Sequence, residues 1–372
     1  MQIIFVSSVA DGGSGQSQRQ LARRLQDRGH RVEVLAATRD SKLIRPLYQR
    51  QVDLSTRLRG NRVRPVLLGA QRPFGSRISQ ESTPDFPTWR AVIPENGYRA
   101  LRRRFTPDVV VASSIERVSW RRLRAQLRAA KIPSVLYIRE ASGLGHLTVT
   151  GAPPDLLVAN AESHAVGARE AGFDCAVVPS IVELQQSATS SSRTTALLVN
   201  PIELLGGDRV WPMAEARPDI PFVLQESGLH SPDERHALRT LAARYPNVTV
   251  RPFQTNPAEV FRDAKVLLVP HRVDNRPRVV LEAQANGIPV IATDHPGLAE
   301  SVGPGGILVD DVDDPTVWTD ALGRVWDDTA HYADLVGAAR LHAARPGVDP
   351  DSIAAEFEQL LEELVARRVD AI

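Results

Sequence analysis

The segment V-L-L-V-P-H-R-V-D-N-R-P-R-V-V-L-E-A-Q-A-N-G-I-P-V-I-A-T-D-H-P-G-L-A-E-S-V, residues 266 to 302, decides the fold of this chain. Its apolar start is a buried strand that ends at Pro270, and a polar loop then leads to Pro277, a residue suited to the first turn of a helix. Gly287 stands where a helix C-cap belongs, and the β-branched run from Ile288 to Ala292 predicts a second buried strand. We therefore expect strand, loop, helix, strand and loop.

Two acidic residues lie on this pattern eight positions apart. Asp274 falls in the loop at the carboxyl end of the first strand, and Glu282 falls one to two turns into the helix. In a parallel α/β sheet this edge is where ligands bind. Both acids are therefore candidate site residues.

Length and composition indicate a globular protein of two domains. The chain has 372 residues, 42% hydrophobic and 24% charged. Its single cysteine, Cys175, excludes an internal disulfide framework and a thiolate metal cluster. A strand at Gln2 to Val6 opens the sequence without a leader-like pattern, and no apolar run reaches membrane-spanning length. We expect a cytoplasmic protein.

The net charge of +1 conceals an asymmetry between the two halves. Residues 1 to 180 hold 28 Lys and Arg against 15 Asp and Glu, whereas residues 181 to 372 hold 17 against 29. The first half therefore attracts anions and the second does not.

The first half reads as a βαβ unit followed by further alternation. A glycine-rich loop joins the opening strand to a helix that ends at Gly29, and a strand follows at Val32 to Ala36. Residues 40 to 106 show weak periodicity and predict loops and short helices. Later strands are expected at 109–112, 134–138, 155–159 and 176–178, and helices at 117–131 and 161–171.

A polar tract from Gln185 to Thr195 has linker character, and the alternation resumes after it. Strands are expected at 196–199, 222–224, 248–250 and 307–309, with helices at 208–216, 232–245, 315–344 and 351–368. We predict a first Rossmann-like domain over 1–184, joined by the helix in 351–372, and a second over 194–346 that faces it.

The sequence resembles the GT-B fold glycosyltransferases, in the large retaining class called family four or group 1. The motifs that carry the resemblance are D-G-G-S-G at 11–15, L-A-R-R-L-Q-D-R-G-H-R-V at 21–32, L-L-V-A-N-A-E-S-H at 156–164, R-P-D-I-P-F-V-L at 217–224 and R-P-R-V-V-L-E-A-Q-A-N-G-I-P-V-I-A-T at 276–293. The resemblance implies an α/β fold of two facing Rossmann-like domains, with a C-terminal helix that crosses back to the first.

The last motif is similar to the family's E-x7-E element. The resemblance implies that Asp274 contacts the donor sugar and that Glu282 contacts the ribose of the nucleotide. Ionised carboxylates accept charge-assisted hydrogen bonds from neighbouring hydroxyls, and the helix N-terminus offers N–H groups to phosphate or sugar oxygens. Asn275, Arg276 and Pro277 occupy that turn and are further donor-binding candidates.

One departure from the family concerns the donor diphosphate. The family's Arg and Lys clamp corresponds here to Asn200 and Leu205, so neither cation is present. Our hypothesis is that one or more of Arg209, His271 and Arg272 replaces it.

The first domain contributes candidates of its own. Gly12 and Gly13 stand in a strand-loop-helix context that favours a phosphate or acceptor contact. The dinucleotide-binding fingerprint there lacks its third glycine, which argues against binding of a nicotinamide cofactor. Arg139 and Glu140 follow a strand at the carboxyl edge, and Glu140 is the candidate acceptor-activating base, with His146 the runner-up and an ion pair within the domain the alternative. No metal ligand cluster is expected.

An arginine stripe on the helix at 117–131 and the run Arg102 to Arg104 account for most of the basic character. A solvated face is the simplest interpretation. The alternatives are a phosphorylated or lipid-linked acceptor at a membrane surface, or nucleic acid, which no recognition module supports.

Together these features predict a retaining, metal-independent glycosyltransferase without a cofactor, which moves a sugar from a nucleotide-diphosphate sugar to an acceptor bound by the first domain. The alternatives are a nucleotide-sugar epimerase or pseudo-glycosyltransferase on the same fold, and a catalytically weakened nucleotide-sugar-binding protein.

Overall fold

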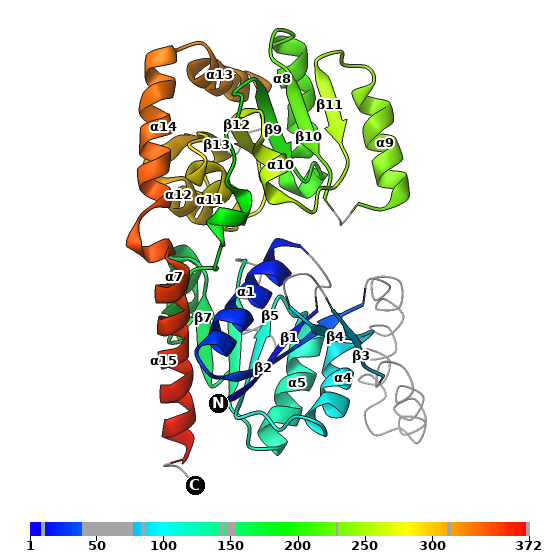
Figure 1. Cartoon of the computed structure of the whole chain (residues 1–372), viewed down its shortest axis with the longest axis vertical. Helices are drawn as coiled ribbons and strands as arrows, with labels where there is room; N and C mark the ends of the chain where they lie inside the picture. The colour runs from blue at the N-terminus through cyan, green and yellow to red at the C-terminus, as the bar shows by residue number, and fades with distance from the viewer. Residues whose placement is uncertain are drawn as a thin grey trace. The chain divides into compact units, whose positions relative to one another are not determined.

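The computed structural model describes residues 1–8, 12–38, 77–82, 86–140, 145, 153–227, 230–310 and 314–369. The chain divides into two compact units (Figure 1). The first comprises residues 1–160, 164–181 and 353–372, and the second comprises residues 161–163 and 182–352. None of the described helices combines the length and the apolar character of a segment that crosses a membrane.

The first unit is built on a sheet with the order β3-β4-β2-β1-β5-β6-β7-β8 in the described part of the chain. Neighbouring strands pair in parallel, except that β3 is antiparallel to β4. The central strands are apolar throughout because helices bury both of their faces. The strands are β1 (Gln2–Ser7), β2 (Arg31–Ala37), β3 (Ser79–Glu81), β4 (Thr88–Ala91), β5 (Val109–Ser113), β6 (Ser134–Ile138), β7 (Leu156–Ala159) and β8 (Ala176–Val177).

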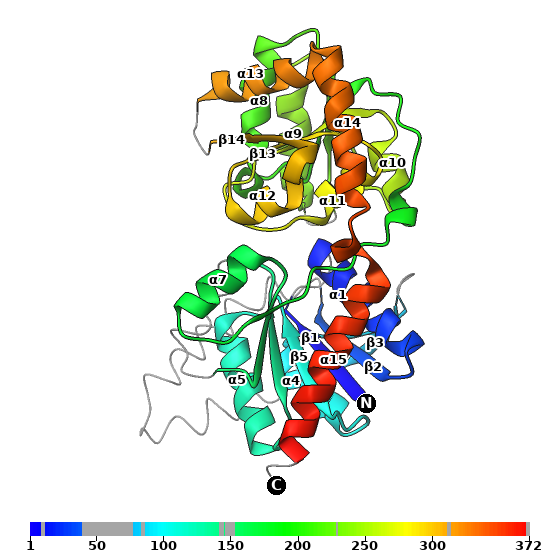
Figure 2. The same ribbon diagram turned by 90° about the vertical axis from the view of Figure 1, so that its left-hand side faces the viewer.

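Helices cover both faces of this sheet (Figures 1 and 2). One face carries α1 (Gly13–Asp27) and α15 (Pro350–Val369), and the other carries α4 (Pro94–Arg102), α5 (Arg117–Ala129) and α7 (Glu162–Glu170). Phe357 of α15 stacks on Phe5 and Tyr137, with ring centroids 6.3 and 5.8 Å apart. The last helix thus belongs to the core of the first unit, which confirms the predicted return.

The second unit contains a parallel sheet with the order β11-β10-β9-β12-β13-β14 among the described residues. Its strands are β9 (Thr195–Val199), β10 (Phe222–Gln225), β11 (Val248–Arg251), β12 (Ala264–Val269), β13 (Val290–Thr293) and β14 (Gly306–Val309). The chain runs outward from β9 through β10 to β11, and then outward from β12 on the other side. The order therefore reverses between β9 and β12, and the carboxyl ends of these two strands mark the switch point where ligands bind in such sheets.

Helices again lie on both faces of the second sheet. One face packs against α8 (Val210–Ala216) and α13 (Pro315–Trp326), and the other against α10 (Pro257–Phe261), α11 (Arg278–Ala285) and α12 (Pro296–Val302). The remaining helices are α9 (Pro232–Ala242), beside β11, and α14 (Thr329–Ala343), which contacts α11 and α13. Short 3-10 segments occur at Leu184–Ser187, Glu203–Leu205, Gly207–Arg209, Gly303–Gly305 and Pro346–Val348.

The segment at 266–302 forms the predicted strand, helix and strand, with two differences. Pro277 is the extended N-cap of α11 instead of its first residue. The final loop contains α12, which begins at Pro296. Proline at the first helical position starts this short helix, because its fixed φ suits the helix and its missing N–H is not needed there.

Three other predictions differ from the structure. The helix expected over 315–344 is two helices, because Asp328 caps α14 by accepting from the N–H groups of Ala330 and His331 at 3.0 and 2.9 Å. Residues 40–106 contain the strands β3 and β4 besides α4, with β3 at the edge of the sheet, whereas residues 39–76 lie outside the described part. The tract at 185–195 is not a free linker, since Ser191 donates to the carbonyl of Ala264 at 2.7 Å.

Candidate functional site

The loops after β9 and β12 meet at the switch point of the second unit. Gly206 adopts a left-handed φ of 68°, and a Cβ there would lie 1.8 Å from the carbonyl oxygen of Pro270. Only glycine allows this approach. Side chains that follow the two strands are thereby brought to one place at the carboxyl edge of the sheet.

Asp274 lies in the loop after β12, as predicted, and its carboxylate has a defined partner. Oδ1 accepts a hydrogen bond from the backbone N–H of Gly297, at the start of α12, at 2.8 Å. A Cβ on Gly297 would come within 2.8 Å of the same oxygen. A charge-assisted hydrogen bond therefore orients this carboxylate across the ends of β12 and β13.

Glu282 lies on α11, as predicted, and forms an ion pair with Arg278. Arg278 Nη2 lies 3.1 Å from Glu282 Oε1, and the two side chains are 8% and 14% exposed. An ionised carboxylate has two oxygens with several lone pairs, so the ion pair leaves acceptor capacity for a hydroxyl group. The pair orients the carboxylate without excluding a ligand.

His271 and Asn275 form a pair within the same loop. His271 Nδ1 lies 3.0 Å from Asn275 Oδ1. Burial of the imidazole lowers the pKa of His271 to about 4, although the bond to Asn275 opposes the shift and His295 adds slightly to it. His271 is therefore uncharged at neutral pH, which does not favour His271 as a replacement for a cation of the clamp.

Arg209 and Arg272, the other two predicted replacements for the clamp, are engaged by protein groups. Arg209 is 8% exposed, donates from Nη1 to the Pro270 carbonyl at 3.3 Å and lies over the ring of Trp318. Arg272 holds both carboxylate oxygens of Asp208 at 2.5 and 2.8 Å, and this contact lowers the pKa of Asp208. Both guanidinium groups therefore already contact protein acceptors within the loops, which does not favour either arginine as the predicted clamp for the diphosphate.

Arg276 lies in the predicted turn before Pro277, and a second cation is near it. Burial, and then the charge of Arg276, lower the pKa of Arg345 to about 10. His342 experiences the same two cations, since burial first and then Arg345 and Arg276 lower its pKa. A concentration of positive charge therefore lies beside the turn that carries Asp274.

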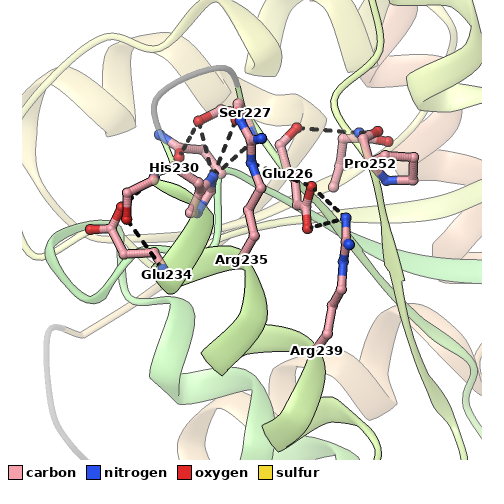
Figure 3. A network of polar contacts seen from close by, with 10 residues as sticks. Glu226, Ser227, His230, Glu234, Arg235, Arg239 and Pro252 are labelled. Atoms are coloured by element: carbon pink, nitrogen blue, oxygen red, sulfur yellow. Dashed lines mark hydrogen bonds and ion pairs between the residues drawn. The ribbon is translucent and has the colours of Figure 1, made fainter. Parts of the chain in front are cut away.

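Asn200 directly follows β9 and contacts Ser227, which belongs to a polar network that the sequence did not predict. Figure 3 shows the part of this network around Ser227, His230, Glu226 and Arg239. Asn200 adopts a φ of 61°, and its Oδ1 accepts from Ser227 Oγ at 2.8 Å. The neighbouring Glu226 is 2% exposed and pairs with Arg239 at 2.9 Å. His230, at the other end of this loop, is 6% exposed. The available signal was a run of polar residues directly after a buried apolar strand.

The predicted residues of the first unit lie at the carboxyl edge of its own sheet. Gly12 has a φ of 108° and is the N-cap of α1, which begins at Gly13. Arg139 is 8% exposed and donates to Ser113 Oγ at 2.8 Å and to Ser180 Oγ at 2.6 Å. Arg139 thus ties three segments together, and Glu140 beside it is exposed. His146 lies outside the described residues.

One group among the described residues has the composition of a metal site, namely His30, Glu358 and Glu362. His30 Nε2 lies 2.5 Å from Glu358 Oε1, and Arg28 Nη2 lies 2.5 Å from the other oxygen of that carboxylate. The positive charge of Arg28 therefore disfavours the binding of a metal cation at this group. These contacts fasten α15 to the first unit at the start of β2, the opposite edge from Arg139.

Comparison with known proteins identifies the fold class first. The chain has the GT-B fold. It superimposes on sucrose-phosphate synthase from Thermosynechococcus elongatus with a TM-score of 0.76 at 17% identity, over 98% of this chain and 99% of that one. A second match is Anabaena Alr3699/HepE in complex with UDP-glucose, with a TM-score of 0.71 at 14% identity, over 98% and 100% of the two chains.

Sequence comparison finds a family resemblance over part of the chain. Residues 210–328 match the family Glycosyl transferases group 1. A D-inositol 3-phosphate glycosyltransferase of Arthrobacter sp. (strain FB24) is 35% identical over 159 residues, a segment that covers 40% of this chain and 38% of that relative. The predicted resemblance to group 1 glycosyltransferases of the GT-B fold is confirmed.

Proposed function

We propose that the protein is a retaining glycosyltransferase that transfers a sugar from a nucleotide-diphosphate sugar to an acceptor bound by the first unit. The observation that carries the proposal is the carboxylate of Asp274, which the N–H of Gly297 orients at the switch point, eight residues before Glu282 on α11. The group 1 match of the same unit supports it.

The chemistry proposed for this site is electrostatic and needs no metal ion. Negative charge builds on the departing diphosphate as the glycosidic bond breaks, so the groups that stabilise this charge lower the barrier. Asp274 accepts from hydroxyls of the donor sugar, and Glu282 accepts from the ribose. The acceptor attacks from the face that the diphosphate leaves, and the leaving phosphate takes the proton of the acceptor. Glu140 is the proposed base that removes the proton of the acceptor hydroxyl where the leaving phosphate does not.

The acceptor side of the proposal draws on the basic surface of the first unit. α5 contains no acidic residue, and the one acid of α4, Glu95, is fully buried and accepts from Ser119. The cations exposed on these helices and in the turn after α4 include Arg102, Arg103, Arg104, Arg117, Arg121 and Arg128. This face suits a phosphorylated or lipid-linked acceptor at an anionic membrane surface, at about 1 kcal/mol for each cation near the surface.

A second candidate is a nucleotide-sugar-binding protein with weak or absent catalysis. The observation that favours it is the neutral pair Asn200 and Leu205 at the clamp positions, together with the engagement of Arg209 and Arg272 by protein groups. Such a protein would hold a donor without stabilising its leaving group.

Incubation of the protein with a panel of nucleotide sugars, beginning with UDP-glucose, separates these functions. Slow release of nucleoside diphosphate supports transfer, and an isomerised donor supports epimerisation. Binding without turnover supports the second candidate. If none of the panel binds, the proposed function is wrong.

A further inference from the structure

Asn286 directly follows the last residue of α11, and its side chain forms three hydrogen bonds. Nδ2 donates to the carbonyl of Glu282 at 2.9 Å and to the carbonyl of Ser187 at 2.8 Å. Oδ1 accepts from the backbone N–H of Thr189 at 2.7 Å. The residue is 8% exposed. One buried amide therefore joins the backbone of Glu282 to the segment 182–194, which precedes β9.

This side chain is not what ends the helix, because backbone hydrogen bonds already do so. Gly287 has a left-handed φ of 64°, and the N–H of Ile288 donates to the carbonyl of Ala283 at 3.0 Å. This is the backbone pattern by which a helix ends at a left-handed glycine. The N–H of Asn286 also donates to Ala283, three residues back. The carbonyl of Glu282 therefore receives the side-chain amide of Asn286 instead.

Two further contacts fasten the segment 182–194 to α11. Arg193 has a φ of 61°, a costly conformation for a residue with a side chain, and its Nη2 donates to the carbonyl of Asn286. Leu281 of α11 belongs to one buried apolar cluster with Val182 and Val348. Both stretches of chain that connect the second unit to the first therefore share this cluster with α11.

We infer that Asn286 is a positioning residue for Glu282, because it fixes the last turn of α11 against the segment 182–194. The inference rests on the proposed function, in which the carboxylate of Glu282 accepts from the ribose of the donor. Arg278 holds that carboxylate at 3.1 Å, and Asn286 holds the carbonyl of the same residue. Both ends of Glu282 are thus fixed, and recognition of this kind needs a group held within about 0.5 Å of its place.

The test measures recognition of the ribose by calorimetry. Uridine, guanosine and adenosine diphosphates are each titrated beside the 2′,3′-dideoxy analogue, and the ratio of the two dissociation constants isolates the ribose hydroxyls. We expect the wild-type protein to prefer the ribonucleotide about 10-fold or more, as one hydrogen bond to a charged group implies. Asn286→Ala should reduce this preference about 3-fold or more, because the turn that carries Glu282 loses its hydrogen bond. Affinity for the dideoxy analogue should stay unchanged, which general damage to the fold would not allow.

Asn247→Ala is the matched control. Nδ2 of Asn247 also donates to three carbonyls, but the residue precedes β11, at the opposite edge of the sheet from the switch point. This variant should lose stability in urea unfolding and keep the wild-type preference for the ribonucleotide. If Asn286→Ala does not fold, Asn286→Ser takes its place. Its hydroxyl can keep one donated hydrogen bond, so its preference should lie between those of the wild type and Glu282→Ala.

The outcomes separate the role of Asn286 from the proposed function. A wild-type preference in the tested Asn286 variant, or an equal decrease in Asn247→Ala, overturns the role of Asn286 while the proposed function stands. A wild-type protein that binds nucleotides without preferring the ribose overturns this role together with the ribose contact of Glu282. Absence of all nucleotide binding overturns both the inference and the proposed function.

Discussion

The backbone N–H of Gly297 donates a hydrogen bond to the proposed catalytic carboxylate of Asp274, and replacing Gly297 with alanine tests the importance of this contact. The added Cβ would meet Asp274 Oδ1 at 2.8 Å and the carbonyl oxygen of Asn275 at 3.0 Å. Asp274 can swing away only by giving up the Gly297 N–H, a charge-assisted bond of about 1.5–3 kcal/mol. The Asn275 carbonyl is backbone, so the loop itself must also shift by a few tenths of an ångström.

Overpacking of this kind costs about 1–3 kcal/mol. For a domain of 150–250 residues the corresponding decrease in Tm is about 2–12 °C. Thermal unfolding by circular dichroism and donor calorimetry measure the two consequences in one protein. We expect Gly297→Ala to lower Tm within this range and to weaken donor binding about 10-fold.

Gly337→Ala provides the matched control for this change. Gly337 lies inside α14, and a Cβ there would meet no atom within 4 Å. Alanine in a helix interior is favoured over glycine by about 0.5–1 kcal/mol, so the control should be slightly more stable. If Gly297→Ala matched the wild type in both Tm and donor affinity, the contact between Gly297 and Asp274 would not organise the site.

Three further predictions concern stability. The pKa of His271 is about 4 in the fold against about 6.5 when unfolded, so the native state binds fewer protons at this group. Its contribution to the free energy of unfolding, about 3 kcal/mol, is therefore complete above pH 6.5 and is lost as the pH falls to 4. His271→Gln should flatten the pH dependence of unfolding over that window, and parallel curves would contradict the assignment. Asn247→Ala should cost about 2 kcal/mol in urea unfolding, since its Nδ2 donates to the carbonyls of Ala214, Arg217 and Ile220 at 3.0–3.1 Å; a loss below 0.5 kcal/mol would show that water replaces these bonds. Arg239→Ala should lower the free energy of unfolding by about 1–2 kcal/mol because it removes a cation that compensates the buried carboxylate of Glu226, and this value allows for the 54% exposure of Arg239. Arg262→Ala, which breaks an exposed ion pair, should lower it by almost nothing.

Much of the fold was predictable from sequence because parallel strands buried on both faces leave long apolar runs. Val266 to Val269 and Val109 to Val111 are of this kind, and each lies inside an observed strand. β3 was not predictable, because Ser79, Gln80 and Glu81 are exposed polar residues whose strand geometry comes from pairing with β4. The break at Asp327 and Asp328 was missed because apolar periodicity continues on both sides of it.

The site was predictable where its residues belong to one segment. Asp274 and Glu282 share a loop and the following helix, so their spacing alone placed them near one edge. Gly297 was not predictable in its role, because the contact that defines it joins residues 23 positions apart along the chain. The contact between Ser227 and Asn200 was not predictable either, since it joins residues 27 positions apart. The charge state of His271 depends on burial and the engagement of Arg272 depends on Asp208, and sequence spacing reports neither.

The most direct test of the central claim is the rate of donor turnover by Asp274→Ala, measured as release of nucleoside diphosphate from the nucleotide sugar that the wild-type protein uses. Under the proposed function, removal of the carboxylate takes away the acceptor for the donor-sugar hydroxyls and leaves the nucleotide contacts in place. We predict a loss of about 100-fold or more in kcat with nucleoside diphosphate affinity nearly unchanged. Turnover at the wild-type rate would contradict the proposed role of Asp274 and the site built around it.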